Sequence, residues 1–181
     1  MDREYAAWAA RWRVPLGFAL AVAYLVFSQP TLPLLAAGGG LAFLGLVVRG
    51  WAAGILEKNV SLATGGPYRY SRNPLYLGSA LTGVGLGIAG GSVVMILAFA
   101  GLFLLVYWPV IRHEERYLRQ RFESAYEEYA ATVPLVVPGR RIGPASDARF
   151  AWSRYRKNRE YEAALGFVAA LTFLVLKMLL R

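Results

Sequence analysis

The sequence predicts an all-α, polytopic membrane protein on three observations. Hydrophobic residues make up 57% of the 181 residues, more than is expected of a soluble domain. Charged residues, 17% of the chain, fall in blocks and leave long stretches without an ionised side chain. Those stretches approach the roughly 20 apolar residues that a membrane-spanning helix needs.

The apolar stretches predict about five spans, arranged as two hairpins and a C-terminal span: residues 14–28, 32–53, 74–89, 92–111 and 163–180. The first and third fall below the usual minimum of about 17 residues, so they depend on flanking aromatic residues or on a tight hairpin. The short, uncharged connections "SQPTLP" and "AGGS" are typical of turns on the far side of a bilayer. We expect residues 1–181 to form one membrane domain, with an N-terminal hairpin at 14–54.

The basic residues predict the orientation of the chain. They precede the first span or lie between spans, apart from Lys177 and Arg181. Those assigned between the second and third spans are Arg49, Lys58, Arg69 and Arg72. The positive-inside rule therefore places the N-terminus and the polar loops in the cytoplasm and the C-terminus on the opposite side.

Charge and cysteine content exclude several classes of function. The net charge of +9 lies on a membrane face, where anionic headgroups are nearer partners than nucleic acid, so we expect no nucleic-acid binding. The chain has no cysteine and one histidine, which excludes a thiolate nucleophile and gives no reason to expect a metal site. The oligomeric state is left open by the sequence.

The segment after the fourth span predicts a continued helix that lies along the membrane surface. In "RHEERYLRQRFESAYEEYAATVP" the aromatic and aliphatic residues recur at helical spacing, and Val133 and Pro134 end the pattern. A second, interfacial helix is expected in "SDARFAWSRYRKNRE", with Ser146 or Asp147 as its cap. Residues 146–181 would thus hold this helix and the C-terminal span.

The polar loop "GGPYRYSRNPLYLG" carries three tyrosines and two arginines at the mouth of the third span. Asn73 suits a helix cap and Pro74 the first helical turn, so the third span should begin here. A tight hairpin would bring Arg69 and Arg72 close to the residues that follow the fourth span. The alternative interpretation is that these arginines and tyrosines only anchor the helix at the interface.

The residues that follow the fourth span are His113, Glu114 and Glu115. Adjacent carboxylates project about 100° apart on a helix, so at most one faces a given site. Together with the arginines and tyrosines of the loop, this cluster suits a ligand that carries a carboxylate and an amine. A solvated helix face is the alternative.

Small residues recur at every fourth position along the third span: Ser79, Gly83, Gly87 and Gly91. Such a ridge usually allows close helix packing, here against the fourth span. The alternative is that the missing side chains let a cofactor approach the backbone.

In combination these motifs resemble the isoprenylcysteine carboxyl methyltransferase and phospholipid methyltransferase superfamily of integral membrane enzymes. The resemblance covers residues 64–138: "GPYRYSRNPLYLG", the glycines of "GVGLG", and "EERYLRQRFESAYEEYAATVP". It implies a cytoplasm-facing pocket for S-adenosylmethionine and a lipid-like or prenylated substrate that enters from the bilayer. The residues it assigns to the cofactor are Tyr68, Asn73, Pro74, Gly83, Gly85, His113, Glu114 and Glu115. Asn73 departs from the family's more common basic residue at this position.

The resemblance further implies substrate contacts through Arg69 and the aromatic residues Phe122, Tyr126 and Tyr129, which would close over the pocket. The catalytic candidates are Arg69, Arg72, Tyr76 and Glu115. A carboxylate acceptor is already a nucleophile that an arginine can orient, whereas an amine acceptor must first lose a proton to a base such as Glu115 or His113.

Because the chain has more arginines than titratable side chains that could act as a base, we expect carboxyl O-methylation of an isoprenylcysteine-like acid. Three alternatives are kept. The first is N-methylation of a phospholipid such as phosphatidylethanolamine. The others are a steroid-reductase-like enzyme that uses NADPH and a non-enzymatic membrane protein that has kept the fold.

Overall fold

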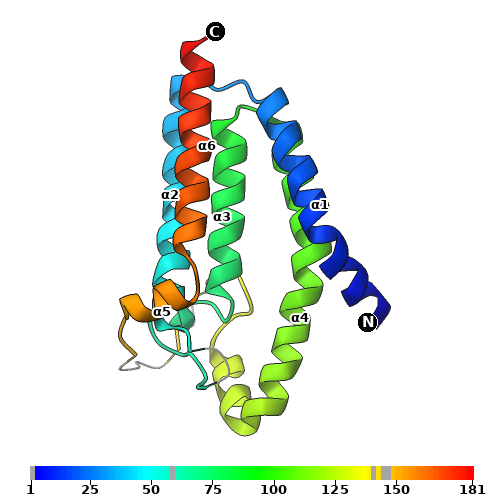
Figure 1. The fold of residues 1–181 in the computed structure, drawn as a ribbon. Helices are drawn as coiled ribbons and strands as arrows, with labels where there is room; N and C mark the ends of the chain where they lie inside the picture. Colours follow the sequence, from blue (N-terminus) through cyan, green and yellow to red (C-terminus); the bar gives the residue numbers. More distant parts are fainter. Residues whose placement is uncertain (1–2, 58–59, 140–141, 144–147) are drawn as a thin grey trace. The chain divides into compact units, whose positions relative to one another are not determined.

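The computed structural model describes residues 3–57, 60–139, 142–143 and 148–181. Within these ranges the chain is helical and contains no strand, which confirms the predicted all-α class. Figure 1 shows the elements in chain order: α1 (Arg3–Phe27), α2 (Leu32–Ile55), the 3-10 helix η1 (Gly66–Arg69), α3 (Pro74–Ala89), α4 (Val93–Thr132), α5 (Trp152–Lys157) and α6 (Tyr161–Leu179).

The apolar helices coincide with the predicted spans. In the described part of the chain, α2, α4 and α6 are long and apolar enough to cross a membrane by length and composition. Two shorter apolar helices, Pro15–Phe27 and Pro74–Ala89, fall where the sequence indicates short spans. The α4 segment continues in helical form past the fourth span to Thr132, as the spacing of its aromatic residues predicts, but a kink at Glu123 divides it into two parts.

The ends of α3 follow from local chemistry. Pro74 is its first residue, and the carbonyl of Asn73 accepts hydrogen bonds from the backbone N–H groups of Tyr76 and Leu77. The helix therefore begins where the Asn-Pro pair predicts. After α3, Gly91 turns the chain with a φ of 66°, a conformation that glycine adopts without steric cost.

The chain divides into two compact units, which we describe separately. The first unit comprises Met1–Phe43, Ala80–Arg112 and Gly166–Arg181, and the second comprises Leu44–Ser79 and His113–Leu165. The helices α2, α3, α4 and α6 each contribute to both units, because the boundaries fall within them.

Glycines allow the helices of the first unit to pack closely. A Cβ atom built on Gly85 would lie 2.4 Å from the backbone nitrogen of Ala42, so α2 and α3 meet backbone to backbone. A Cβ atom on Gly83 would lie 2.0 Å from the ring of Phe99, and Gly87 is covered in the same way by Ile96 of α4. Gly83 and Gly87 of the ridge therefore pack against α4, as the packing interpretation expects, whereas Ser79 contacts Arg49 of α2 and Gly91 lies against Gln29.

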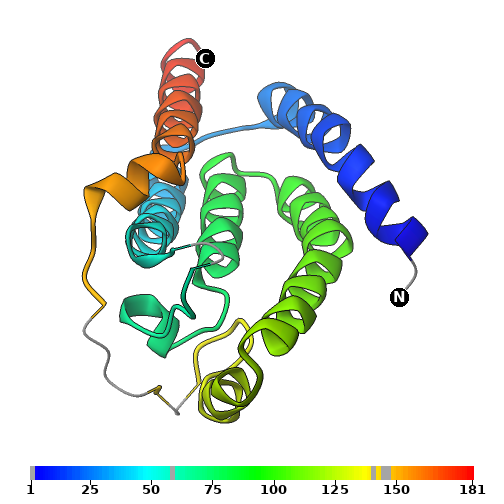
Figure 2. The same ribbon diagram turned by 60° about the horizontal axis from the view of Figure 1, so that its bottom comes forward.

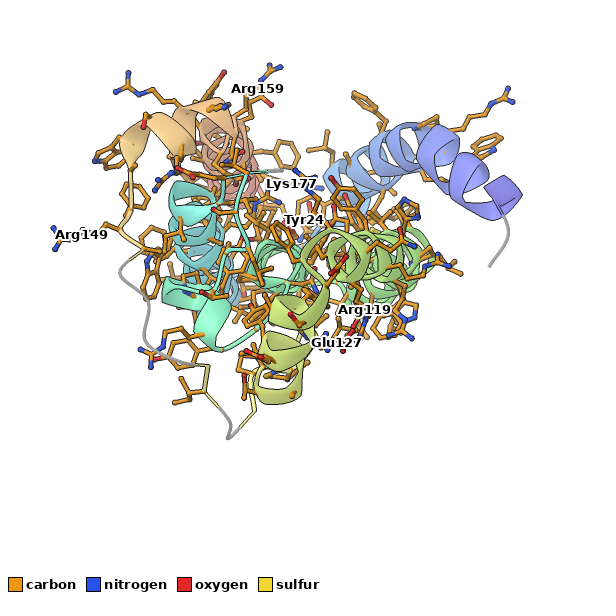
Figure 3. The ribbon with its side chains drawn as sticks, turned by 90° about the horizontal axis from the view of Figure 1, so that it is seen from below. Tyr24, Arg119, Glu127, Arg149, Arg159 and Lys177 are labelled. Carbon is orange, nitrogen blue, oxygen red and sulfur yellow. The ribbon has the colours of Figure 1, made fainter. Side chains whose placement is uncertain are left out.

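A lysine of α6 closes the C-terminal end of α1 in the first unit. The Lys177 ammonium donates to the carbonyls of Leu25, at 2.6 Å, and Val26, at 3.0 Å, and to the Ser28 hydroxyl, at 3.2 Å. These carbonyls have no partner within their own helix, and a cation is the favoured group at this end of a helix. Tyr24, labelled with Lys177 in Figure 3, donates to the carbonyl of Leu86 of α3 at 2.7 Å.

In the second unit, the segment that contains α5 is fastened to the end of α2. The side-chain amide of Asn158 donates to the carbonyls of Ala53, at 2.8 Å, and Leu56, at 3.3 Å, which α2 leaves unpaired. The Phe150 ring fills the space above Gly54, where an added Cβ atom would lie 2.1 Å away. Figure 2 shows α5 at this end of α2.

Two details of the sequence interpretation are corrected here. The helix expected in the "SDARFAWSRYRKNRE" segment begins later, at Trp152 with Ala151 as its N-cap residue, and the expected caps Ser146 and Asp147 lie outside the described residues. Arg49, which was assigned to the segment between spans, lies inside α2, because a buried carboxylate pairs with it there.

Candidate functional site

A buried ion pair joins the start of α3 to α4 in the second unit. The Arg72 Nη1 donates to Glu115 Oε1 at 2.7 Å, and the two side chains are only 11% and 7% exposed. The backbone N–H of Arg72 donates to the carbonyl of Pro134 at 2.9 Å, which holds the residue from its main chain as well. The hairpin argument from the sequence therefore correctly placed Arg72 beside Glu115.

Two aromatic side chains from the end of α4 surround this pair. The Tyr126 hydroxyl accepts a hydrogen bond from Arg72 Nη1 at 3.3 Å, and its ring lies beside the Arg72 guanidinium, 5.9 Å from Cζ. The Tyr129 hydroxyl donates to the carbonyl of Tyr68 at 2.7 Å. Tyr126, Tyr129 and Val133 form a buried cluster, against which Phe122 packs.

A sharp bend in α4 places these tyrosines beside Arg72. Glu123 has a φ of 42° and a ψ of −118°, and helical geometry holds on either side of it. A residue other than glycine rarely adopts positive φ, and holding it there costs about 1–3 kcal/mol. Figure 2 shows that the helix turns sharply near its C-terminal end. Nothing in the sequence marks this bend, because the residue at the turn is a glutamate.

Arg119 is a site residue that the sequence interpretation missed. Its Nη2 donates to Glu115 Oε1 at 3.2 Å, so two guanidinium groups share one carboxylate. Its Nη1 also pairs with Glu127, beyond the bend, and its Cζ lies 5.4 Å from the centre of the Tyr126 ring. The arginine lies one helical turn after Glu115, and that i,i+4 spacing was the signal available in the sequence.

The remaining polar candidates lie around this cluster. The Tyr76 hydroxyl donates to Glu114 Oε1 at 3.1 Å. The Arg69 Nε donates to the carbonyl of Gly143 at 3.0 Å, and its own carbonyl accepts from the N–H of Gly143. Arg69 thus fastens the connector that follows α4, and His113 is exposed.

Asn73 and the two glycines have structural partners. The Asn73 side-chain amide donates to the carbonyl of Leu135 at 3.0 Å, and Pro74 is buried at the start of α3. Gly83 and Gly85 belong to the first unit, where Phe99 and Ala42 occupy the space beside them. The contacts described at both glycines are helix packing, and their assignment to a cofactor stays a prediction.

Burial keeps the phenols of the site neutral. Desolvation raises the pKa of Tyr126, while the hydrogen bond from Arg72 acts in the opposite direction. Burial also raises the pKa of Tyr129 and of Tyr68. At neutral pH these rings therefore exclude water and offer hydroxyl groups without adding charge to the cluster.

The fold and this cluster together define a polytopic helical membrane protein with buried ionic chemistry at the end of its membrane helices. Residues 36–125 match the phospholipid methyltransferase family. The chain is also similar to protein-S-isoprenylcysteine O-methyltransferase B of Arabidopsis thaliana, with 35% identity over 82 residues that cover 45% of this chain and 42% of that protein. The chain belongs to the isoprenylcysteine carboxyl methyltransferase and phospholipid methyltransferase superfamily and is an integral membrane protein.

Two bacterial proteins are also similar to this chain. The cobalt-zinc-cadmium resistance protein CzcN of Cupriavidus metallidurans is 37% identical over 136 residues, which cover 70% of this chain and 62% of that protein. The nickel-cobalt-cadmium resistance protein NccN of Alcaligenes xylosoxydans xylosoxydans is 35% identical over 82 residues, which cover 45% of this chain and 38% of that protein. The chain thus spans less than two thirds of the length of each of these three relatives. No solved structure matches it significantly.

Among the described residues, no group of three or more His, Cys, Asp or Glu side chains is placed to hold a metal ion.

Proposed function

We propose that the protein transfers a methyl group from S-adenosylmethionine to a lipid-like acceptor, and that the acceptor is the carboxylate of an isoprenylcysteine-like acid. Membership of the superfamily supports methyl transfer. The similarity to a protein-S-isoprenylcysteine O-methyltransferase supports the kind of acceptor.

One observation carries the proposal: a buried arginine with hydrogen-bonding capacity to spare. The Nε of Arg72 is buried and has no hydrogen-bond partner among the described residues, although Nη1 of the same side chain is engaged. A buried donor left unpaired is costly, and such exceptions call for an explanation. Since guanidinium groups bind carboxylates through paired N–H groups, a carboxylate ligand would satisfy this donor.

The residues present fit S-adenosylmethionine, which carries both a carboxylate and an ammonium group. The exposed carboxylate of Glu114 can accept from the ammonium group of the cofactor, and the unpaired N–H group of Arg72 is left for the carboxylate of the acceptor. When bound, S-adenosylmethionine supplies an electrophilic methyl group on a positively charged sulfur. Arg72 orients the carboxylate of the acceptor, while the buried rings of Tyr126 and Tyr129 exclude water around it.

The hydrogen bonds of Glu115 favour a carboxylic acid over an amine as the methyl acceptor. Its Oε1 accepts hydrogen bonds from both Arg72 and Arg119. Glu115 is therefore better placed to fix arginines than to take a proton from an amine. A carboxylate needs no such step because it is already the nucleophile. N-methylation of a phospholipid is the alternative within the same chemistry, with exposed His113 as its candidate base.

The proposed site lies on the cytoplasmic side, with the N-terminus. The exposed arginines Arg112, Arg116 and Arg121 flank the cluster on α4, and the positive-inside rule assigns such a segment to the cytoplasm. A soluble cofactor would enter from this side, and an apolar acceptor would enter from the bilayer.

The test is transfer of labelled methyl from S-adenosylmethionine to a prenylcysteine analogue and to total membrane lipid, followed by mild base. Label released as methanol indicates an ester and supports the proposed acceptor. Base-stable label in lipid indicates N-methylation and overturns the proposed acceptor. If the folded protein neither binds S-adenosylmethionine nor transfers label, the proposed activity is wrong.

A further inference from the structure

The last part of α4 and the residue after it, residues 124–133, fold back at Glu123 and cover the Arg72–Glu115 pair; we call this segment the arm. Its inner side carries Tyr126 and Tyr129, which are 1% and 6% exposed. Beyond the bend, therefore, the arm is held by side-chain contacts rather than by a straight continuation of the helix.

One side chain bridges the two parts of α4 across this bend. Arg119 pairs with Glu115, four residues before it, and with Glu127, eight residues after it. Figure 3 labels Arg119 and Glu127, whose side chains lie together on the bent part of the helix. A pair eight residues apart does not form on one face of a straight helix at hydrogen-bonding distance, since the axial rise alone would be about 12 Å.

We propose that Arg119 is a positioning residue that holds the arm over the Arg72–Glu115 pair. It acts through Glu115 and Glu127 and need not touch a ligand. The reason for holding the arm rests on the proposed function, because a covered Arg72 is useful only if a ligand binds there. The contacts that hold it do not depend on that function.

The exposure of the bridge makes it the most easily broken of the contacts that hold the arm. Arg119 is 39% exposed and Glu127 is 57% exposed, so solvent weakens their attraction, whereas Glu115 at the other end of the bridge is buried. The Arg119–Glu115 contact is thus the stronger of the two, and the Arg119–Glu127 contact is the more easily broken. A site that must admit a ligand and then exclude water needs such a reversible cover.

The absence of native cysteine makes a direct test simple. Ala130→Cys places one thiol on the partly buried Ala130, which packs against the Tyr126 cluster. The rate at which a maleimide labels this thiol, in detergent and without cofactor, reports how often the arm opens. We expect Arg119→Gln to raise the rate about two- to fivefold, the range that a partly exposed ion pair supports.

Matched variants distinguish loss of the Arg119 contacts from a nonspecific effect of substitution on the fold. Glu127→Gln removes only the far contact and should raise the labelling rate by part of the Arg119→Gln effect. Glu128→Gln, at the exposed neighbouring position, and Arg121→Gln, at an exposed arginine of the same helix, should leave it unchanged. Unchanged labelling in both Arg119→Gln and Glu127→Gln overturns the proposal, even if methyl transfer is confirmed. Accelerated labelling supports it, even if no methyl acceptor is found.

Kinetics give a second readout if the proposed activity is present. Loss of positioning should raise the KM for S-adenosylmethionine in Arg119→Gln, because only the closed state binds well, and kcat should recover at saturating cofactor. Arg119→Lys, which keeps the charge, should recover part of the effect. A loss of kcat that saturating cofactor does not restore would assign Arg119 to the chemistry and overturn the positioning role.

Discussion

The second unit contains two Arg–Glu pairs in which the glutamate is buried, and the two arginines differ in how many of their donors are engaged. Arg49 donates to the Glu160 carboxylate through Nε and Nη2, both at 2.8 Å, and its Nη1 donates to Ser79 Oγ at 2.6 Å. Arg72 contacts Glu115 through Nη1 alone, and its Nε has no partner in the described part of the chain.

The difference leads us to assign a structural role to the Arg49–Glu160 pair and a binding role to the Arg72–Glu115 pair. At Arg49 every guanidinium nitrogen is engaged, so the pair fastens α2 to the segment before α6 and leaves nothing for a ligand. At Arg72 the geometry leaves a donor unused although the side chain is nearly buried. Since unused buried donors are rare in proteins, the second pair is the candidate site and the first is a structural fastener.

The largest effect on stability should come from breaking the saturated pair. Glu160→Gln removes the charge that balances Arg49, and breaking a buried ion pair costs about 3–5 kcal/mol; the lower value applies because Arg49 is 29% exposed. Thermal unfolding in detergent measures the loss. The matched control is Glu162→Gln, whose partner Arg159 lies on the surface, and it should cost less than about 1 kcal/mol. Equal melting of the two variants would contradict the contrast.

Arg72→Ala should do the reverse: lose activity and keep the fold. Removing one preorganised donor typically costs about 10²–10³-fold in rate, and Glu115 keeps Arg119 as its partner, so no uncompensated charge is left behind. The comparison variant is Arg121→Ala, an exposed arginine of α4, which should be neutral. Methyl transfer per folded molecule, checked by the melting temperature, is the measurement. Full activity in folded Arg72→Ala would exclude the residue from the site.

The sequence predicted one of the two pairs and the start of α3, but not the other pair or the bend. The Asn-Pro pair predicted the first residue of α3, and hairpin geometry predicted that Arg72 would meet the glutamates after the fourth span. The Arg49–Glu160 pair was not predicted, because its partners are 111 residues apart and nothing local connects them. An arginine within the apolar run "LVVRGW" was nevertheless a signal, since a charge at membrane depth requires a partner. The bend at Glu123 depends on long-range packing that no local pattern records.

A smaller effect is expected at Tyr129, whose hydroxyl serves structure rather than the ligand. Tyr129→Phe leaves the carbonyl of Tyr68 without this donor and should cost about 1–2 kcal/mol, as for an unsatisfied buried acceptor. Tyr126→Phe should cost less stability, because its contact with Arg72 is longer, at 3.3 Å. Denaturant unfolding of the two variants makes the comparison. A larger loss in Tyr126→Phe would reverse these assignments.

The pH dependence of the same variants has a defined sign. Burial raises the folded-state pKa of Tyr129 above its ordinary value of 10.0, so the protonated phenol is favoured by folding. The resulting stability is complete below pH 10 and is lost as the pH rises toward the folded-state pKa. Wild type should therefore lose stability above pH 10 more steeply than Tyr129→Phe, as unfolding at a series of pH values will show. Identical slopes would contradict a raised pKa.

The smallest effect should be a gain. Glu123→Gly relieves a positive φ that costs about 1–3 kcal/mol, against a loss of about 0.5–1 kcal/mol from the added freedom of glycine in the unfolded chain. We expect a net stabilisation of about 1 kcal/mol. The control Ala125→Gly, two residues further along α4, should instead destabilise by about 1 kcal/mol. If both glycines destabilise equally, the bend is not strained.

The fastening of residues 148–160 to α2 bears on how the protein can be divided. Asn158 and Phe150 close the C-terminal end of that helix, and the Phe150 ring fills the space beside Gly54. A shortened protein that ends after Pro138 would keep the residues of the resemblance and still leave the carbonyls of Ala53 and Leu56 without these partners. Experiments aimed at a minimal catalytic fragment should therefore retain the chain at least through Glu160, however little the tail contributes to chemistry.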